Sequence, residues 1–314
     1  MGNNILASHA KWGQKHAMVF IPEHAEKFRF RRSALFMPAS NARALEKART
    51  LSCDTLIFDL EDAVADDARG TAHENLLTLV KGEEFGGRER VIRVSAYGSP
   101  TFSEDLAVAL ACQPDAILLP KVEQAGTIAE VANLAGSDGP IPAPGLWTPA
   151  IWAMIETPMA LLNLREICAA SKRLSCLVVG PNDLAKATGT SMEQGRDAML
   201  PWLMMIIAAA RAHGQSVLDG VYNNFRDIDG LAAECAQGAS MGFDGKTLIH
   251  PSQIDTANNA FGPSEKEIAR AQAIVDAFSL PSADGKGAIQ INGEMVERLH
   301  LAVAERLLRL METP

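Results

Sequence analysis

The chain has 314 residues, 47% of them hydrophobic, and its 38 acidic and 29 basic side chains leave a net charge of −9. This length and apolar content allow a large buried core, which excludes disorder for most of the chain. The acidic balance argues against nucleic acid as a partner, because nucleic-acid-binding proteins usually present a basic face. We expect no membrane span or secretory signal, because no apolar run reaches the ~18 residues that cross a bilayer.

The five cysteines are far apart in the sequence and include no CxxC pair. This spacing favours buried, reduced thiols over disulfides or a zinc site. Reduced thiols are typical of the cytoplasm, which is the expected location.

A short apolar run followed by an amphipathic segment recurs between Arg32 and Phe261. The predicted strands are Ala34–Met37, Thr55–Asp59, Val91–Val94, Ala116–Leu119, Ala153–Ile155, Cys176–Val179, Ser216–Leu218 and Met241–Gly242. The predicted helices are Asn41–Leu51, Asp67–Val80, Ser103–Cys112, Glu123–Ala135, Pro158–Ala170, Gly195–Ala212, Asp227–Gln237 and a short one after Ser252. This α/β alternation predicts a (β/α)8 TIM barrel, with an open doubly wound sheet as the alternative.

Three segments follow from this division: an N-terminal extension (1–31), a TIM-barrel domain (32–261) and a C-terminal helical arm (262–314). The Pro/Gly-rich stretch Gly136–Pro149 predicts a loop before the fifth strand. In the arm we expect a helix over Ser264–Phe278, a glycine-containing spacer and a last helix near Glu294–Met311. The arm is too short to fold alone, so we expect it to pack on the barrel or on a neighbouring subunit.

Charged residues lie at or near the predicted ends of almost all the strands, where a TIM barrel carries its chemistry. They are Asp59, Glu61, Asp62, Arg93, Lys121, Glu156, Asp183, Asp219, Asp244 and Lys246. A purely structural barrel has no need of so many charges at one rim. The pattern therefore predicts an enzyme, with a binding or scaffold protein as the alternative.

Glu156 and Asp183 close consecutive predicted strands, so we expect their side chains to be neighbours. Two adjacent carboxylates repel each other unless a cation lies between them. Two oxygen ligands suit Mg²⁺, which keeps several waters and takes further ligands from substrate. The alternative is that both carboxylates cap helix N-termini.

Arg93 ends the third strand and is predicted to hold a substrate carboxylate or a developing enolate oxygen. Glu61 and Asp62 are predicted to orient Arg93 or to bind the metal through water. A plain ion pair between Arg93 and these carboxylates is the alternative.

Eight ordered segments resemble the citrate lyase β-subunit-like branch of the HpcH/HpaI aldolase superfamily, which includes the malyl-CoA and citramalyl-CoA lyases. They are RSALFMPASNARALEKA…DTLIFDLEDAV, VIRVS, LLPKVE, MIETP, VVGPNDLA, LDGVYNNFRDIDGL, GFDGKTLIHPSQI and GEMVERL. The resemblance covers the chain from Arg32 to the C-terminus. It implies a TIM barrel, a Mg²⁺ ion held by Glu156 and Asp183, and a homotrimer or hexamer.

The resemblance also implies roles for residues outside the metal pair. Arg93 and Arg69 match arginines that bind substrate, although Ser95 replaces the usual Asn after Arg93. In similar lyases the C-terminal arm covers a neighbouring subunit's site and supplies an acidic acid/base residue. Glu297 stands at that position, where an Asp is usual.

The function that we expect is reversible retro-Claisen cleavage of a 3-hydroxyacyl-CoA thioester of malyl-CoA or citramalyl-CoA type. Arg93, Glu297, Glu61 and Asp62 would be catalytic, and Lys121 and Thr157 would join Arg69 and Arg93 in binding substrate. Lys47 and Arg43 would contact the CoA phosphates. One alternative is a citrate lyase β subunit acting on an acyl-carrier-protein thioester beside α and γ subunits. The other is a catalytically silent barrel that serves as an assembly partner.

Overall fold

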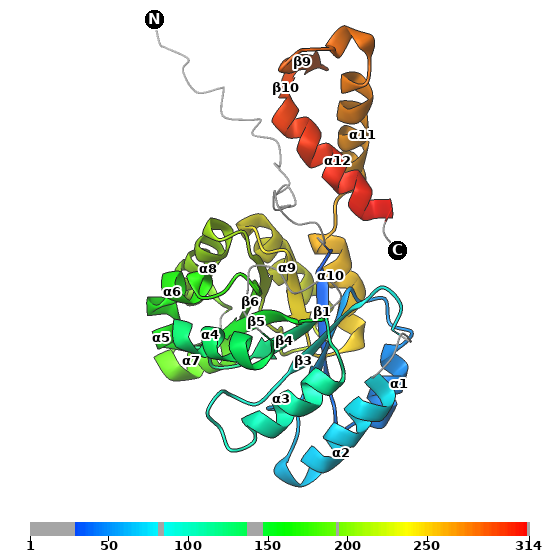
Figure 1. Cartoon of the computed structure of the whole chain (residues 1–314). Coiled ribbons are helices and arrows are strands. Elements are labelled where there is room, and N and C mark those ends of the chain that lie inside the picture. The colour runs from blue at the N-terminus through cyan, green and yellow to red at the C-terminus, as the bar shows by residue number, and fades with distance from the viewer. Residues whose placement is uncertain (1–28, 81–84, 137–146, 193–194, 313–314) are drawn as a thin grey trace, which may run out of the picture.

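The part of the chain that the structure describes contains eight parallel strands that close into a barrel, with β8 paired to β1 (Figure 1). The structure is a computed structural model that describes residues 29–80, 85–136, 147–192 and 195–312. The barrel strands are β1 (Ser33–Pro38), β2 (Thr55–Asp59), β3 (Glu89–Arg93), β4 (Ala116–Leu119), β5 (Ala150–Ile155), β6 (Leu174–Val179), β7 (Ser216–Asp219) and β8 (Gly245–Leu248). This closure confirms the predicted (β/α)8 TIM barrel.

Helices follow each strand and cover the outside of the barrel (Figure 1). They are α1 (Ala42–Ala48), α2 (Arg69–Asn75), α3 (Phe102–Ala111), α4 (Ala125–Leu134), α5 (Pro158–Leu162), α6 (Leu164–Ala169), α7 (Pro181–Thr188), α8 (Leu200–Ala212), α9 (Ile228–Met241) and α10 (Ile254–Phe261). The predicted helix Pro158–Ala170 is two helices, because the chain leaves the helical conformation at Asn163. The predicted helix Asp67–Val80 ends in a π-helical turn at Leu76–Val80.

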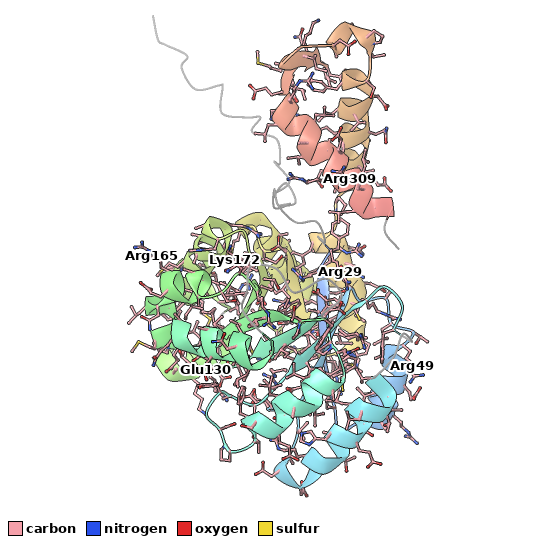
Figure 2. All side chains as sticks on the ribbon, viewed as in Figure 1. Arg29, Arg49, Glu130, Arg165, Lys172 and Arg309 are labelled. Atoms are coloured by element: carbon pink, nitrogen blue, oxygen red, sulfur yellow. The ribbon has the colours of Figure 1, made fainter. Side chains whose placement is uncertain are left out.

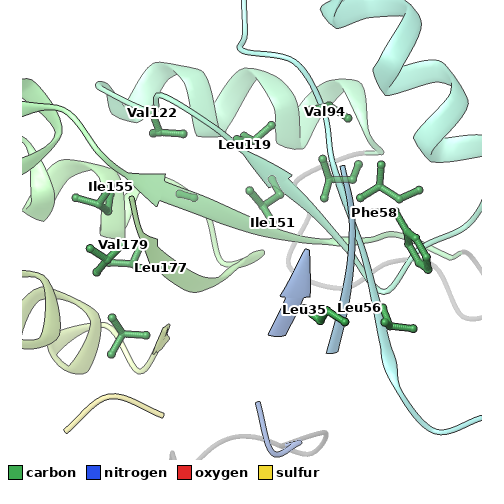
Figure 3. Close-up of a cluster of buried hydrophobic side chains, with 14 of the residues drawn as sticks. Leu35, Leu56, Phe58, Val94, Leu119, Val122, Ile151, Ile155, Leu177 and Val179 are labelled. Atoms are coloured by element: carbon green, nitrogen blue, oxygen red, sulfur yellow. The ribbon is translucent and has the colours of Figure 1, made fainter. Parts of the chain in front are cut away.

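The strands are apolar on both faces, and successive side chains point alternately into the barrel and out toward the helices. Ile57, Trp152 and Val178 belong to the inner cluster and are almost fully buried. The outer cluster, between sheet and helices, includes Phe58 and Ile155 and is shown in Figure 3. Burial on both faces explains why these strands read as continuous apolar runs.

The N-terminal end of the barrel is closed by a buried ion pair. Arg31, within the predicted extension, donates to both oxygens of Glu89 at 2.7 and 2.8 Å and to Ser216 Oγ at 2.8 Å. Its guanidinium also lies 5.0 Å from the centre of the Trp152 ring. Residues 1–28 of the predicted extension lie outside the described residues, as do residues 137–146 of the predicted Pro/Gly-rich loop.

The prediction of the eighth strand is wrong. Met241 ends α9, and Gly242 caps that helix in the left-handed conformation at φ 105°. The real strand β8 carries the buried Lys246, so it lacks the apolar run that marks the other strands.

Three of the charges assigned to the rim do not lie there. Asp244 precedes β8 and pairs with Arg211, with N–O distances of 2.8 and 2.9 Å. Lys246 Nζ contacts Asp219 at 3.0 Å and Glu234 of α9 at 2.7 Å. Because alternate strand residues point outward, Asp219 and Lys246 tie the sheet to the helix layer rather than facing substrate.

The chain after α10 forms a separate projection, the C-terminal arm, built from α11 (Glu265–Phe278), a hairpin and α12 (Arg298–Glu312) (Figure 1). The hairpin strands are β9 (Ala288–Ile291) and β10 (Glu294–Glu297). The predicted helical start at Glu294 is therefore wrong. Asn292 and Gly293 form the turn with φ of 50° and 85°, which is the conformation that an Asn-Gly hairpin turn requires.

The arm meets the barrel at the N-terminal ends of the strands. Leu310 of α12 and Arg29, Arg32 and Arg88 help to line a cavity of about 630 Å³ there. Figure 2 labels Arg309 on α12 and Arg29 at the barrel end beneath it. None of the predicted site residues lines this cavity.

All five cysteines are buried and none forms a disulfide, as expected. Within the described ranges, no helix is both long and apolar enough to cross a membrane.

Candidate active site

Glu156 follows β5 directly and is only 1% exposed, yet only one of its two carboxylate oxygens has a hydrogen-bond donor. Oε1 accepts a hydrogen bond of 2.7 Å from the backbone N–H of Lys121, whereas buried Oε2 has no partner. Burial, with Asp183 and Glu61 nearby, raises the pKa of Glu156 to about 7. A buried oxygen without a donor is costly, which indicates that something else binds there.

Asp183 lies in the first turn of α7, the helix that follows β6. Its carboxylate makes no hydrogen bond or ion pair with any residue that the structure describes. Its negative charge contributes to the raised pKa of Glu156, which supports the predicted proximity of the pair. Neither carboxylate caps a helix, because Thr157 caps α5 and the N-cap of α7 is Gly180. The helix-cap alternative is therefore excluded.

A divalent cation with oxygen ligands fits these two residues. Among the described residues, no group of three or more His, Cys, Asp or Glu side chains is arranged to hold a metal. The protein thus offers one unpartnered buried oxygen and one free carboxylate. Mg²⁺ suits so small a ligand set, because it retains waters and also binds substrate oxygens.

Gly180 makes room for Glu156. A Cβ at position 180 would lie 2.3 Å from Glu156 Oε2 and 2.5 Å from its Cβ. Both groups follow paired strands, since Ile155 and Val179 are register partners. Only glycine at 180 therefore leaves the Glu156 carboxylate in its present place.

We expect Gly180→Ala to weaken divalent-cation binding at least about tenfold and to destabilise the fold by about 1–3 kcal/mol, because the carboxylate must move. Calorimetric Mg²⁺ titration and thermal melting measure the two effects. Gly126→Ala is the matched control, since a Cβ there meets nothing within 4 Å in helix α4. Unchanged Mg²⁺ affinity in a folded Gly180→Ala protein would contradict the placement of Glu156.

Arg93 is held by three carboxylates from the end of β2. Nε and Nη2 donate to the two oxygens of Asp59, each at 2.6 Å. Nη1 lies 3.0 Å from Glu61 Oε2 and 3.4 Å from Asp62 Oδ2. The predicted pairing of Arg93 with Glu61 and Asp62 is present, but its main partner is Asp59, a residue not chosen as a site residue.

Asp59 could have been identified from the sequence by strand alternation. It is two residues from Ile57, so it shares the inward face, and its register partner in β3 is Arg93. These carboxylates raise the pKa of Arg93 further above its usual value, although burial opposes this effect.

Lys121 joins the Arg93 cluster to the Glu156 pair. Its backbone N–H binds Glu156, and its ammonium lies 2.6 Å from Glu61 Oε1. The residue adopts a left-handed conformation at φ 52°, which is uncommon outside glycine and often marks functional sites. The hydrogen bond to Glu61 raises the pKa of Lys121, and the side chain remains 44% exposed. An ammonium has three donors, so Lys121 can still bind a substrate anion.

The rim carries an excess of negative charge. Among the residues that the structure describes, Arg93 and Lys121 are the cations in direct contact with its carboxylates. The carboxylates of this group are Asp59, Glu61, Asp62, Glu156 and Asp183. Burial raises the pKa of Glu61, although Arg93 and Lys121 oppose the shift. A divalent cation would offset this excess.

The other predicted substrate- and CoA-binding residues do not all lie beside Glu156 and Asp183. Thr157 accepts a hydrogen bond of 3.2 Å from the Ala160 N–H, so its hydroxyl oxygen serves as a helix cap. Arg69 is largely buried against Asp105 at 2.9 Å. Arg43 and Lys47 are exposed on α1, which follows β1 at the rim.

Glu297 lies far from these groups within one chain. It is exposed at the end of β10, in the hairpin at the outer end of the arm (Figure 1). The arm meets the barrel at the N-terminal ends of the strands, opposite the rim. A single chain therefore does not bring Glu297 to its own Glu156.

Comparisons with known proteins decide the family. A family model described as HpcH/HpaI aldolase/citrate lyase matches residues 32–251. The chain belongs to the HpcH/HpaI aldolase/citrate lyase family. A (3S)-malyl-CoA thioesterase of Cereibacter sphaeroides is 44% identical over 281 residues, covering 90% of this chain and 94% of the relative. The citrate lyase subunit β of Escherichia coli K12 is 31% identical, covering 86% of this chain and 90% of the relative.

A solved structure in this HpcH/HpaI family has a similar fold. Protein CitE from Mycobacterium tuberculosis, in complex with magnesium, acetoacetate and coenzyme A, matches with a TM-score of 0.68 and 29% identity. The match covers 89% of this chain and 97% of that chain. The relatives are lyase or thioesterase enzymes, and this chain is an enzyme of the family.

Proposed function

We propose that the chain is a Mg²⁺-dependent enzyme that acts on CoA thioesters of malyl-CoA type, and that it hydrolyses the thioester bond. The observation that carries the metal is the unpartnered buried oxygen of Glu156 beside Asp183. Support for the substrate and reaction comes from the 44% identity to (3S)-malyl-CoA thioesterases over nine-tenths of the chain.

Mg²⁺ bound by Glu156 and Asp183 would act as a Lewis acid and orient the hydroxy-acid end of the substrate. Lys121 would bind the free carboxylate of the substrate through its remaining donors. Arg93, fixed by Asp59 and Glu61, would polarise the thioester carbonyl. Arg43 and Lys47 on α1 would contact the CoA phosphates. In hydrolysis, the water oxygen bonds to the thioester carbonyl carbon and the carbon–sulfur bond breaks. A proton from water goes to the sulfur, so the products are a carboxylic acid and the CoA thiol.

Retro-Claisen carbon–carbon cleavage of malyl-CoA or citramalyl-CoA is the second candidate. The citrate lyase β subunits at about one-third identity favour it, and so does the protonated, buried Arg93, which can stabilise an enolate oxygen. In this reaction a base takes the proton of the 3-hydroxyl group, the bond between C2 and C3 breaks, and a 2-oxo acid and an acyl-CoA enolate form. The enolate is then protonated.

The two reactions give different products, so one assay separates them. Purified chain with Mg²⁺ is incubated with malyl-CoA, citramalyl-CoA or citryl-CoA. Free thiol is followed with a disulfide reagent, and 2-oxo acid is followed as its phenylhydrazone. Hydrolysis releases thiol without 2-oxo acid, whereas cleavage releases 2-oxo acid and leaves the thioester intact. Consumption of citryl-CoA alone would favour a citrate lyase β subunit, and no consumption of any thioester would contradict both reactions.

Mg²⁺ affinity should depend on pH through Glu156, whose pKa is raised to about 7. Mg²⁺ needs the carboxylate, so we expect its apparent Kd to rise about tenfold per pH unit below pH 7 and to level off above it. In the metal-free protein the same raised pKa contributes stability that is complete below the ordinary value of 4.5 and is lost as pH rises through 7. Calorimetric Mg²⁺ titrations across this pH range measure how the Kd depends on pH. A Kd that is constant with pH would contradict the role of Glu156 in binding the metal.

We also propose that Glu297 acts in the site of a neighbouring copy, within a homotrimer or hexamer. Its remote position in one chain supports this assignment. Mixing Glu297→Ala with Glu156→Ala subunits should restore activity, up to about one quarter of wild type when subunits mix evenly, because some sites receive both native residues. The separate variants, measured at the same total concentration, are the controls. No recovery after confirmed subunit exchange would count against a shared site.

A further inference from the structure

A buried cluster lies beside the Arg93 site and shares no residue with the metal pair. At its centre is Asp105 of α3, which is 0% exposed. Its Oδ2 accepts hydrogen bonds from the backbone N–H and the hydroxyl of Ser95 and from Arg69 Nη1. Its Oδ1 lies 2.7 Å from His73 Nε2. The carboxylate is thus surrounded by groups from α2 and from the segment after β3.

Arg69 connects this cluster to the end of β2. Its Nη1 lies 3.0 Å from the backbone oxygen of Leu60 and 3.1 Å from Ser95 Oγ, as well as 2.9 Å from Asp105. Leu60 stands between Asp59 and Glu61, the two carboxylates nearest Arg93. Ser95 stands two residues after Arg93 itself. One guanidinium nitrogen therefore binds the chain on both sides of the Arg93 ion pair.

We infer that Arg69, Asp105 and Ser95 form a positioning clamp that holds the ends of β2 and β3 so that Asp59 and Glu61 meet Arg93. The backbone supports this geometry, because the Leu60 N–H donates to the Arg93 carbonyl oxygen at 2.9 Å. The catalytic effect of the clamp rests on the proposed function. The clamp assigns Arg69 a positioning role, in place of the substrate contact that the family resemblance implies.

The clamp also gives a reason for Ser95. A hydroxyl both donates and accepts, and Ser95 Oγ uses both capacities: it donates to Asp105 and accepts from Arg69 and from Thr101 Oγ1 at 2.9 Å. Alanine at this position would remove these bonds without leaving a buried charge unpaired. Ser95→Ala is therefore a mild test of the clamp, and Asp105→Asn is a strong one.

The test measures the NMR signal of the Arg93 side chain in the full chain, without substrate. In ¹⁵N-arginine-labelled protein, the Nε–H signal of Arg93 is assigned by its loss in Arg93→Lys. We expect Ser95→Ala and Asp105→Asn to shift this signal and to speed its hydrogen exchange at least about tenfold, although neither residue contacts Arg93. Asp244→Asn is the matched control, because Asp244 forms a buried two-bond pair with Arg211 at the other end of the barrel. It should leave the signal unchanged.

Kinetics separates positioning from substrate contact. We expect Ser95→Ala and Arg69→Lys to lower kcat about 10- to 100-fold, with KM and the Kd for Mg²⁺ changed less than about twofold, since small displacements of a catalytic group cost this much. A large rise in KM in Arg69→Lys alone would instead show substrate contact and overturn the clamp. An unchanged Arg93 signal in folded Ser95→Ala would also overturn it, even if Asp105→Asn does not fold. If wild type cleaves no thioester, the proposed function fails while the Arg93 signal still decides the clamp.

Discussion

Glu156→Gln is expected to lower turnover at least about 1,000-fold and to abolish measurable Mg²⁺ binding. Glutamine keeps the shape and can still accept the Lys121 N–H bond, but it lacks the charge that Mg²⁺ requires. A loss of about 4 kcal/mol of transition-state stabilisation corresponds to this factor. The metal-free variant should also be more stable than metal-free wild type at neutral pH, by about 1–3 kcal/mol, because a desolvated carboxylate is removed.

The combination of lost activity and gained stability is the distinctive part of this expectation. Steady-state kinetics, calorimetric Mg²⁺ titration and thermal melting in the presence of a chelator measure the three quantities. Glu130→Gln, on an exposed face of helix α4 (labelled in Figure 2), is the control and should change none of them. Retention of Mg²⁺ affinity in Glu156→Gln would show that the metal site lies elsewhere.

Arg93→Ala is expected to cost about 3–5 kcal/mol of folding stability, because it leaves the buried Asp59 carboxylate without its cation. Asp59 is 1% exposed with Arg93 in place, and without the guanidinium its oxygens keep the backbone N–H donors of Glu61 and Ala63 but no cation. The gentler Arg93→Lys keeps a charge but loses the two-bond geometry. We expect Arg93→Lys to fold and to lower kcat about 100-fold or more.

A double variant distinguishes the pair from a general packing defect. Asp59→Asn combined with Arg93→Ala should recover part of the stability lost in Arg93→Ala, because no unpaired charge then remains. Chemical denaturation of the single and double variants gives the coupling energy. Strict additivity of the two losses would contradict the buried ion pair.

Most strands of the barrel can be predicted from the local sequence. Seven of the eight barrel strands overlap apolar runs chosen from the sequence, because a strand covered on both faces is apolar at every position. The strand β8 does not follow this rule, because it is buried on both faces but is not apolar at every position. Lys246 lies in its middle, and its charge is balanced by Asp219 and Glu234, which are distant in sequence.

The predicted start of the last helix in the arm is wrong for a different reason. The Asn292-Gly293 pair is a hairpin signal, but the strands β9 and β10 that it joins are only four residues each. Short alternating runs give a weak strand signal beside a strongly amphipathic helix. The helical pattern of α12 was therefore extended four residues too far, from Arg298 back to Glu294.

The alternation of strands and helices can be predicted from the sequence alone. So can the carboxylates that follow consecutive strands, from which Glu156 and Asp183 are predicted as a metal site. These features depend on nearest neighbours along the chain, since side-chain direction has a period of two in strands and 3.6 in helices. The sequence does not show that Asp59 is the main partner of Arg93 or that Asp219 and Lys246 face the helices, because these contacts form only in the folded barrel. The ion pair between Arg69 and Asp105 is a third contact of this kind. Barrel closure brings these groups together from distant segments, and buried charges pair with whichever opposite charge that closure places beside them.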